Sequence, residues 1–229
     1  MIIDIIAGAR PNFVKISPII KEIKKQKNLK KYFLRLIHTG QHYDRNMSDI
    51  FFKQLNIKHP DINFKSGSGT YANQVGKIMK SYEELLNKKK SSLCIVVGDV
   101  NSTIACALIA KQNNIKVAHV EGGIRSDDLK MPEEINRIIT DSITDYFFTT
   151  SRFANKNLKN LGVKRKQIYF VGNTMIDTLK SNLKNLKKPL FYNKVLASNN
   201  FFLLTIHRPS NTDKLSELNK ILFLIAKLS

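Results

Sequence analysis

Short apolar runs recur along the chain, and segments with helical spacing separate them. The runs predicted as strands are Ile2–Ala7, Phe33–His38, Leu93–Val97, Lys116–Val120, Tyr146–Thr149, Ile168–Val171 and Phe201–Ile206. Most of their residues are apolar or β-branched and do not alternate with polar residues, which is typical of strands buried on both faces. Such strands, joined through helices, form parallel sheets with right-handed crossovers. The sequence therefore predicts an α/β fold with a doubly wound parallel sheet.

The first helix is predicted from apolar residues that share one helical stripe within Phe13–Lys27. Ser17 followed by Pro18 resembles an N-cap with proline at the first helical position. We therefore expect this helix to begin or to kink at Ser17.

A change of composition predicts a domain boundary. Lysines, Pro189, a serine and asparagines fill Leu186–Asn200, directly after a predicted helix at Thr174–Leu183. We expect a first domain over 1–185, a linker over 186–200 and the start of a second domain over 201–229. One strand and one helix cannot bury their own apolar faces, so the second domain is expected to be truncated.

The chain of 229 residues has 38 basic and 18 acidic residues, a formal charge of +20. Such a charge raises the hypothesis of nucleic-acid binding. Only eight of the basic residues are arginines, however, and no cluster interleaves them with aromatic residues, as readers of bases and phosphates do. Nucleic acid is therefore not an expected partner.

No apolar run approaches the length of a membrane span, and no basic segment opens the chain as in a signal peptide. We expect a cytoplasmic protein with no membrane partner. Cys94 and Cys106 lie in apolar or small-residue runs and are expected to be buried, reduced thiols.

Reactive side chains follow four of the predicted strands. Arg10, Asp99, Glu121 and His207 each come directly or shortly after a strand. In an open parallel sheet, ligands bind beyond the carboxyl ends of the strands. We therefore expect these four side chains to gather around one ligand.

Each of these residues also has a purely structural interpretation. Asp99 could cap the following helix, and Glu121 could be a solvated loop residue. Arg10 could form a surface ion pair, and His207 could be satisfied at the end of its strand. Glu133, behind Pro132, could complement the helix dipole or pair with Arg137 four residues later. The shared position at strand ends favours the functional interpretation of the set.

Several common motifs are absent from the sequence. The glycine-rich segment Ser66–Thr70 lacks the lysine of a P-loop, and no G-x-G-x-x-G follows the first strand. The histidines and cysteines show no metal-ligand spacing, and no G-x-S-x-G elbow is present. No metal or other cofactor is therefore expected.

An ordered set of motifs resembles the non-hydrolysing UDP-N-acetylglucosamine 2-epimerases from Met1 to about Asn211. The motifs are Gly8–Lys15 (GARPNFVK), Thr39–Asp44 (TGQHYD), Gly98–Thr103 (GDVNST), His119–Ser126 (HVEGGIRS), Met131–Arg137 (MPEEINR), Gly172–Thr174 (GNT) and His207–Asn211 (HRPSN). The resemblance implies a glycosyltransferase-B-like fold with two Rossmann-type domains facing a cleft. It also implies a homodimer.

The reaction that this resemblance implies interconverts UDP-N-acetylglucosamine and UDP-N-acetylmannosamine, for cell-envelope polysaccharide synthesis. UDP is eliminated to leave a 2-acetamidoglucal, which is protonated on its opposite face before UDP adds back. Acid and base groups must serve C2, and cations or donors must meet the departing diphosphate.

The family's functional residues can be transferred to this sequence one motif position at a time. Asp99, Glu121 and Glu133 match the family's acid and base carboxylates, and crowding is expected to separate their proton affinities. His207 matches a residue that supports departure of the diphosphate. The resemblance gives the remaining substrate-binding positions as Arg10, Lys15, Arg208 and Asn211.

Two segments bear on regulation and on the site entrance. Gln41 and His42 match a segment that binds a second UDP-N-acetylglucosamine as activator in some bacterial members. Asn12 stands where many members have glutamate, so the entrance of the site is expected to be less acidic. The uridine and ribose contacts of the family are expected beyond Ser229, so this chain could be inactive by itself.

Two other functions remain open from the sequence. One is a glycosyltransferase of the same architecture, which would need no carboxylates at Glu121 and Glu133. The other is a non-catalytic module that binds a nucleotide sugar or nucleic acid.

Overall fold

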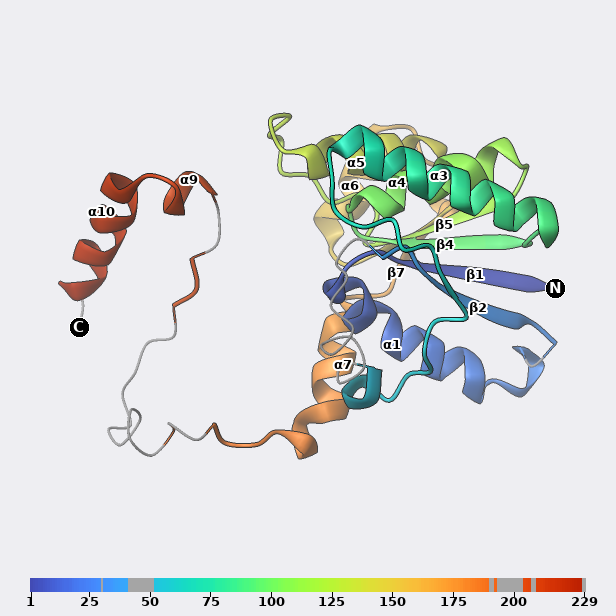
Figure 1. The fold of residues 1–229 in the computed structure, drawn as a ribbon, viewed down its shortest axis with the longest axis horizontal. Coiled ribbons are helices and arrows are strands. Elements are labelled where there is room, and N and C mark those ends of the chain that lie inside the picture. The colour runs from blue at the N-terminus through green and yellow to red at the C-terminus, as the bar shows by residue number, and fades with distance from the viewer. Residues whose placement is uncertain (30, 41–51, 190–191, 193–203, 207–208, 228–229) are drawn as a thin grey trace. The chain divides into compact units, whose positions relative to one another are not determined.

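A computed structural model of the chain describes residues 1–29, 31–40, 52–189, 192, 204–206 and 209–227. They belong to two compact units, 1–184 and 185–229, each described here by itself. The first unit contains a parallel sheet of seven strands in the order β3-β2-β1-β4-β5-β6-β7 (Figure 1). This arrangement confirms the predicted α/β class and the doubly wound sheet.

The strands follow the prediction closely. They are β1 (Ile2–Ala7), β2 (Phe33–His38), β3 (Ile62–Asn63), β4 (Leu93–Val97), β5 (Lys116–Val120), β6 (Tyr146–Thr149) and β7 (Ile168–Phe170). Strand β7 ends one residue before the predicted end, and the two-residue edge strand β3 was not predicted. Of the strand predicted at Phe201–Ile206, only residues 204–206 are described, and they have no regular secondary structure.

Helices cover both faces of the sheet. Those of the first unit are α1 (Arg10–Lys25), α3 (Tyr71–Lys88), α4 (Asn101–Gln112), α5 (Pro132–Ile143), α6 (Arg152–Asn160) and α7 (Thr174–Asn182), with 3-10 turns at Lys27–Leu29, Arg165–Gln167 and Leu183–Asn185. Helices α3, α4 and α5 pack side by side on one face, and α1 and α7 pack together on the other (Figure 1).

Helix α1 begins at Arg10, with Pro11 in its first turn, so the predicted start or kink at Ser17 is wrong as a helix boundary. Pro18 lies inside the helix and cannot donate a hydrogen bond to the carbonyl of Val14, four residues earlier. The Thr178 hydroxyl of α7 donates to that carbonyl instead, at 2.7 Å. Because the freed carbonyl finds this partner, the helix continues through the proline.

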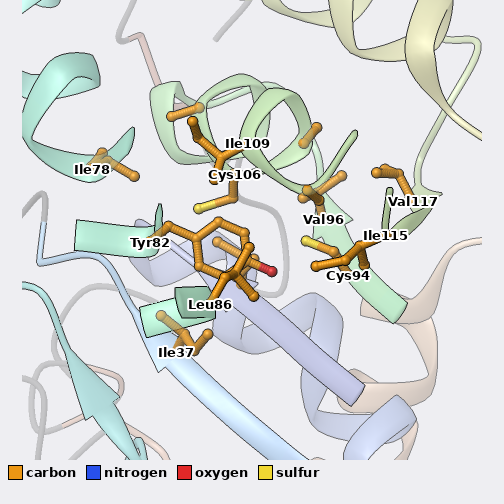
Figure 2. Close-up of a cluster of buried hydrophobic side chains, with 14 residues drawn as sticks. Ile37, Ile78, Tyr82, Leu86, Cys94, Val96, Cys106, Ile109, Ile115 and Val117 are labelled. Atoms are coloured by element: carbon orange, nitrogen blue, oxygen red, sulfur yellow. The ribbon is translucent and has the colours of Figure 1, made fainter. Parts of the chain in front are cut away.

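Each face of the sheet has its own apolar core. One core packs β-strand side chains such as Ile5 and Val97 against α1. The other packs α3 and α4 against the opposite face, and Figure 2 shows Tyr82, Cys94 and Cys106 within it. Both thiols are fully buried and free, as predicted, and burial raises their pKa.

A buried ion pair lies within the sheet. Arg35 of β2 donates two hydrogen bonds to Asp4 of β1, at 2.6 and 2.9 Å, and the Tyr82 hydroxyl donates a third at 2.9 Å. Both charges are almost fully buried, so this pairing satisfies groups that would otherwise be costly to desolvate.

The second unit contains α9 (Pro209–Thr212) and α10 (Leu215–Ala226). Several large apolar side chains of α10 are exposed, among them Leu215, Phe223 and Leu224. Clustered exposed apolar side chains of this kind are typical of surfaces that pack against other protein segments. Within the described part of the chain, no helix has both the length and the apolarity needed to cross a membrane.

Candidate active site

The connections of the sheet diverge between β1 and β4. Strand β1 continues through α1 to β2 on one side, whereas β4 continues through α4 to β5 on the other. Neighbouring strands whose connections diverge leave a crevice beyond their carboxyl ends, where ligands bind. The loops after β1, β4 and β5 begin with Gly8, Gly98 and Glu121, so the predicted residues of these loops lie at this edge.

Asn12 joins the two sides of the crevice. Its side-chain oxygen accepts hydrogen bonds from the backbone N–H groups of Gly8 and Ala9, at 3.0 and 2.9 Å. Its amide group donates to the carbonyl of Val97, the last residue of β4, at 3.1 Å. Only 2% of Asn12 is exposed. Asn12 therefore has a structural role, because its side chain fixes the turn after β1 to the end of β4.

A lysine and a glutamate meet across the crevice. The Lys15 ammonium of α1 lies 2.5 Å from Glu121 Oε2, and both side chains are largely buried. A Cβ atom built on Gly98 would lie 3.3 Å from Lys15 Nζ and 3.6 Å from Glu121 Oε2. The residue after β4 is thus small and has a positive φ of 68° beside this ion pair.

Asp99 is paired with a cation of its own. Its carboxylate forms an ion pair with Arg137 of α5, and its backbone carbonyl accepts a hydrogen bond from Asn136, at 2.8 Å. The N-cap of α4 is Val100, and its side chain makes no capping bond. The alternative that Asp99 caps this helix is therefore wrong. Because Asp99 and Glu121 each face a cation, the expected crowding of carboxylates against one another is replaced by two ion pairs.

The two adjacent glutamates of α5 have different surroundings. Glu133 is exposed in the first turn of the helix, whereas only 1% of Glu134 is exposed. Glu134 accepts hydrogen bonds from both the N–H and the hydroxyl of Ser126, at 3.0 Å, and from Arg137, at 2.8 Å. Arg137 therefore joins Glu134 to Asp99, in place of the predicted alternative pair with Glu133.

Hydrogen bonding sets the acidity of Glu134. Burial by itself would raise the pKa of this carboxyl group. The hydrogen bonds from Ser126, Arg137 and Asp127 outweigh burial and lower the pKa below its ordinary value. Glu134 is thus a charged anchor for the loop that joins β5 to α5.

The structure places Lys15, Asp99 and Glu121 at the edge formed by α1, β4 and β5, where Lys15 pairs with Glu121 and Asp99 pairs with Arg137. Arg10 is exposed as the first residue of α1, at the same edge, and Glu133 is exposed on α5. Asn211 lies in α9 of the second unit. The predicted positions Gln41, His42, His207 and Arg208 lie outside the described residues.

Sequence reasoning missed the roles of Asn12 and Arg137. Both lie within the motifs quoted for the family, so the motifs were the signal that could have found them. No local spacing indicates that Arg137 reaches Asp99, which lies 38 residues earlier in the chain. Across the residues the structure describes, no group of three His, Cys, Asp or Glu side chains could hold a metal ion.

Comparisons with known proteins point to one family. The model of the family described as UDP-N-acetylglucosamine 2-epimerase matches residues 21–229. A UDP-N-acetylglucosamine 2-epimerase of Methanococcus maripaludis is 42% identical, over 99% of this chain and 62% of that protein. One from Methanocaldococcus jannaschii is 43% identical, over 96% of this chain and 60% of that protein. The chain thus spans about three fifths of the length of these relatives.

Solved structures agree with the sequence comparison. The crystal structure of the Methanocaldococcus jannaschii enzyme in complex with UDP-GlcNAc and UDP matches with a TM-score of 0.85 and 41% identity. The match covers 99% of this chain and 62% of that chain. A structure from Rickettsia bellii matches with a TM-score of 0.81 and 28% identity, over 99% of this chain and 59% of that chain. The chain belongs to the UDP-N-acetylglucosamine 2-epimerase family.

Proposed function

We propose that the protein to which this chain belongs interconverts UDP-N-acetylglucosamine and UDP-N-acetylmannosamine. The observation that carries this proposal is the Lys15–Glu121 pair beside Gly98 at the switch point of the sheet, with Asp99 as the next residue after Gly98. Acid and base groups and a cation are what this epimerisation requires at C2 and at the diphosphate. The product would supply the synthesis of cell-envelope polysaccharide.

The chemistry is an elimination followed by an addition. One carboxylate removes the C2 proton while the C1–O bond breaks, so that UDP departs and a C1–C2 double bond forms. A second carboxyl group then protonates C2 from the opposite face, and UDP adds back to C1. Asp99 and Glu121 are proposed for these two proton transfers, and Glu133 assists from the start of α5.

Cations near the crevice are proposed to bind the diphosphate. Arg10 opens α1 and Lys15 follows five residues later, while no acidic residue occupies the first turn of that helix. A helix N-terminus with adjacent cations suits a phosphate group. Substrate-binding roles are also proposed for His207, Arg208 and Asn211, and binding of an activating nucleotide sugar for Gln41 and His42.

Incubation with UDP-N-acetylglucosamine in deuterated water tests the proposed reaction. The expected result is UDP-N-acetylmannosamine that carries deuterium at C2, with no added acceptor and no added cofactor. Sugar transfer to an acceptor without deuterium at C2 would instead indicate a glycosyltransferase. Binding of the nucleotide sugar with neither outcome would indicate a non-catalytic module.

One relative acts on a different UDP-sugar, so that sugar should be tested as a second substrate in the same assay. A UDP-2,3-diacetamido-2,3-dideoxy-D-glucuronate 2-epimerase of Pseudomonas aeruginosa is 41% identical, over 91% of this chain and 58% of that protein. Its identity is close to that of the archaeal relatives, so identity alone does not separate the two substrates. Comparison of kcat/KM for both substrates decides between them.

We further propose that the protein forms a homodimer through α5. Ile135, Ile138 and Ile139 are exposed at positions i, i+3 and i+4, and so form one apolar stripe along this helix. Apolar stripes of this kind on a packed domain are typical of interfaces between protein chains.

A further inference from the structure

A buried histidine and a buried aspartate lie next to the proposed site, and the proposed reaction gives neither of them a role. His119 of β5 is fully buried, and Asp141 of α5 is 3% exposed. His119 Nδ1 lies 2.8 Å from Asp141 Oδ1, and His119 Nε2 lies 2.8 Å from the carbonyl oxygen of Gly98. The imidazole ring thus bridges α5 and the turn that follows β4.

Both partners of the ring are hydrogen-bond acceptors. The Gly98 carbonyl can only accept, so His119 Nε2 carries a proton. The Asp141 carboxylate also accepts the Gly123 N–H, at 3.0 Å, and its Oδ2 lies 2.7 Å from Arg125 Nη2. The Gly123 donor and the adjacent Arg125 cation stabilise the ionised carboxylate, so Nδ1 carries a proton as well.

The surroundings of Asp141 favour its ionised form. Burial by itself would raise the pKa of this carboxyl group. The hydrogen bond from His119 and the charges of His119 and Arg125 outweigh burial and lower the pKa below its ordinary value. Asp141 is therefore an anion that can hold a positively charged ring.

Glycine at position 122 leaves room for the pair. A Cβ atom built on Gly122 would lie 3.2 Å from Asp141 Oδ1 and 3.3 Å from His119 Nδ1. It would also lie 2.9 Å from a ring carbon of Phe147, which is closer than real Cβ contacts allow. The first glycine after Glu121 thus has a packing role beside the imidazole, in addition to any role toward a ligand.

Gly98 links the His119 ring to the proposed site, because it has contacts with both. His119 holds the carbonyl of this residue, whereas a Cβ on the same residue would contact Lys15 and Glu121. Asp99 follows Gly98 directly, and His119 of β5 lies two residues before Glu121, the first residue after this strand. One imidazole therefore connects the turn that carries one carboxylate to the strand that ends just before the other.

We propose that His119, held doubly protonated by Asp141, is a positioning residue that fixes the turn carrying Asp99 relative to Glu121. The charged groups that face this arrangement are Asp141 of α5, Arg125 of the loop after β5 and, across Gly98, the Lys15–Glu121 pair. The catalytic consequence rests on the proposed function. The protonation of the ring does not, because it is a property of the chain alone.

Nuclear magnetic resonance of the 229-residue chain with ¹⁵N-labelled histidine tests the protonation. The expected result at neutral pH is a His119 ring with a directly bonded proton on each nitrogen. In Asp141→Asn, which lacks the anionic partner, one of these protons should be lost. A wild-type ring with one unprotonated nitrogen at neutral pH would overturn the proposal, whether or not the chain has activity.

Kinetics of C2 exchange test the positioning role. His119→Gln should lower kcat about 10- to 100-fold with little change in KM, as loss of a supporting hydrogen bond does elsewhere. Tyr82→Phe removes a buried hydrogen bond to Asp4, away from the site, and should leave kcat per folded molecule unchanged. Wild-type kcat in both His119→Gln and Asp141→Asn would overturn the positioning role. If the wild type itself shows no exchange, the proposed function fails, and the resonance experiment alone decides the state of the ring.

Discussion

Gly98 has a backbone conformation and a set of neighbours that both exclude a side chain. Its φ of 68° lies in the left-handed region that L-residues rarely adopt, and Lys15 Nζ would lie 3.3 Å from a Cβ atom there. Its carbonyl is also fixed by His119. At the scale of single residues, this glycine lies beside side chains of α1, of β5 and of the loop after β5.

Comparison of alanine substitutions at Gly98 and Gly162 separates the effect of backbone strain from the effect on the site. We expect Gly98→Ala to lower the free energy of unfolding by about 1–2 kcal/mol and to reduce C2 exchange sharply, because the methyl group displaces Lys15. Gly162 has a similar φ of 80°, and a Cβ atom built on it would meet nothing within 4 Å. Gly162→Ala should therefore cause the same backbone strain without changing the site. Equal exchange rates in the two variants, measured per folded molecule, would remove Gly98 from the site.

The two carboxylates are expected to be essential for epimerisation. Asp99→Asn and Glu121→Gln each keep the size of the side chain but lose the group that transfers the proton. We expect either change to lower formation of UDP-N-acetylmannosamine by at least about 100-fold, the lower end of what a positioned acid or base contributes. Circular dichroism and denaturant unfolding check that the fold survives. A variant that forms product at the wild-type rate would take its residue out of the mechanism.

Helix α1 illustrates what local sequence rules can and cannot predict about an element. The apolar stripe within Phe13–Lys27 predicts a helix because helical spacing depends only on neighbouring residues. The start of the helix was missed because Ser17 and Pro18 imitate an N-cap. Proline is tolerated inside α1 because Thr178, 164 residues later than Val14, bonds the freed carbonyl. No local pattern contains that contact.

Loss of this contact should destabilise the packing of α7 on α1. Thr178→Val is nearly the same size but leaves the Val14 carbonyl without its donor. We expect the free energy of unfolding to fall by about 1–3 kcal/mol, the usual cost of a buried unsatisfied group. Thr178→Ser keeps the hydroxyl and should cost clearly less. Denaturant unfolding of the two variants compares them, and equal losses would show that the hydroxyl is unimportant.

The loop between β5 and α5 should respond to pH through Glu134. Because the pKa of Glu134 is lowered in the folded state, its stabilising effect is full above the pKa of an unfolded glutamate, about 4.3, and is lost as the pH falls through the lower folded value. Glu134→Gln should therefore be less stable than the wild type at pH 7, and the difference should shrink as the pH falls below about 4.3. Exposed Glu133 provides the matched control, since Glu133→Gln should leave this pH dependence unchanged. A difference that stays constant down to about pH 3 would contradict the anchoring role.

At the scale of the whole molecule, the sequence predicted the sheet better than the site. Strands buried on both faces are apolar at most positions, so five of them have the predicted bounds, whereas the two-residue edge strand β3 has too few residues to form a pattern. The placement of Asp99 and Glu121 at one edge was predictable because the topology collects strand ends there, whereas Lys15 followed only from the motif resemblance. The partner of Asp99 was not predictable, since the pairing of Asp99 with Arg137 depends on how α5 packs beside α4.

The proposed homodimer also concerns the whole molecule, because it depends on a surface of the folded domain. Ile138→Asp places a charge in the middle of the apolar stripe on α5, and we expect it to convert a dimer into a monomer, as measured by sedimentation or light scattering. Leu179 of α7 is also exposed, at 55%, so Leu179→Asp is the control that should leave the mass unchanged. A wild-type chain that is monomeric at all accessible concentrations would contradict the proposal for this chain.

Lys15, Asp99 and Glu121 are proposed to surround one sugar at the switch point between β1 and β4, and every catalytic role above depends on this placement. A crystal structure of the protein with UDP-N-acetylglucosamine tests it most directly. We expect the sugar C2 atom within proton-transfer reach of the Asp99 or Glu121 carboxylate, at roughly 3 Å or through one water, with the diphosphate toward Arg10 and Lys15. A nucleotide sugar bound away from this edge, with C2 out of reach of both carboxylates, would contradict the placement.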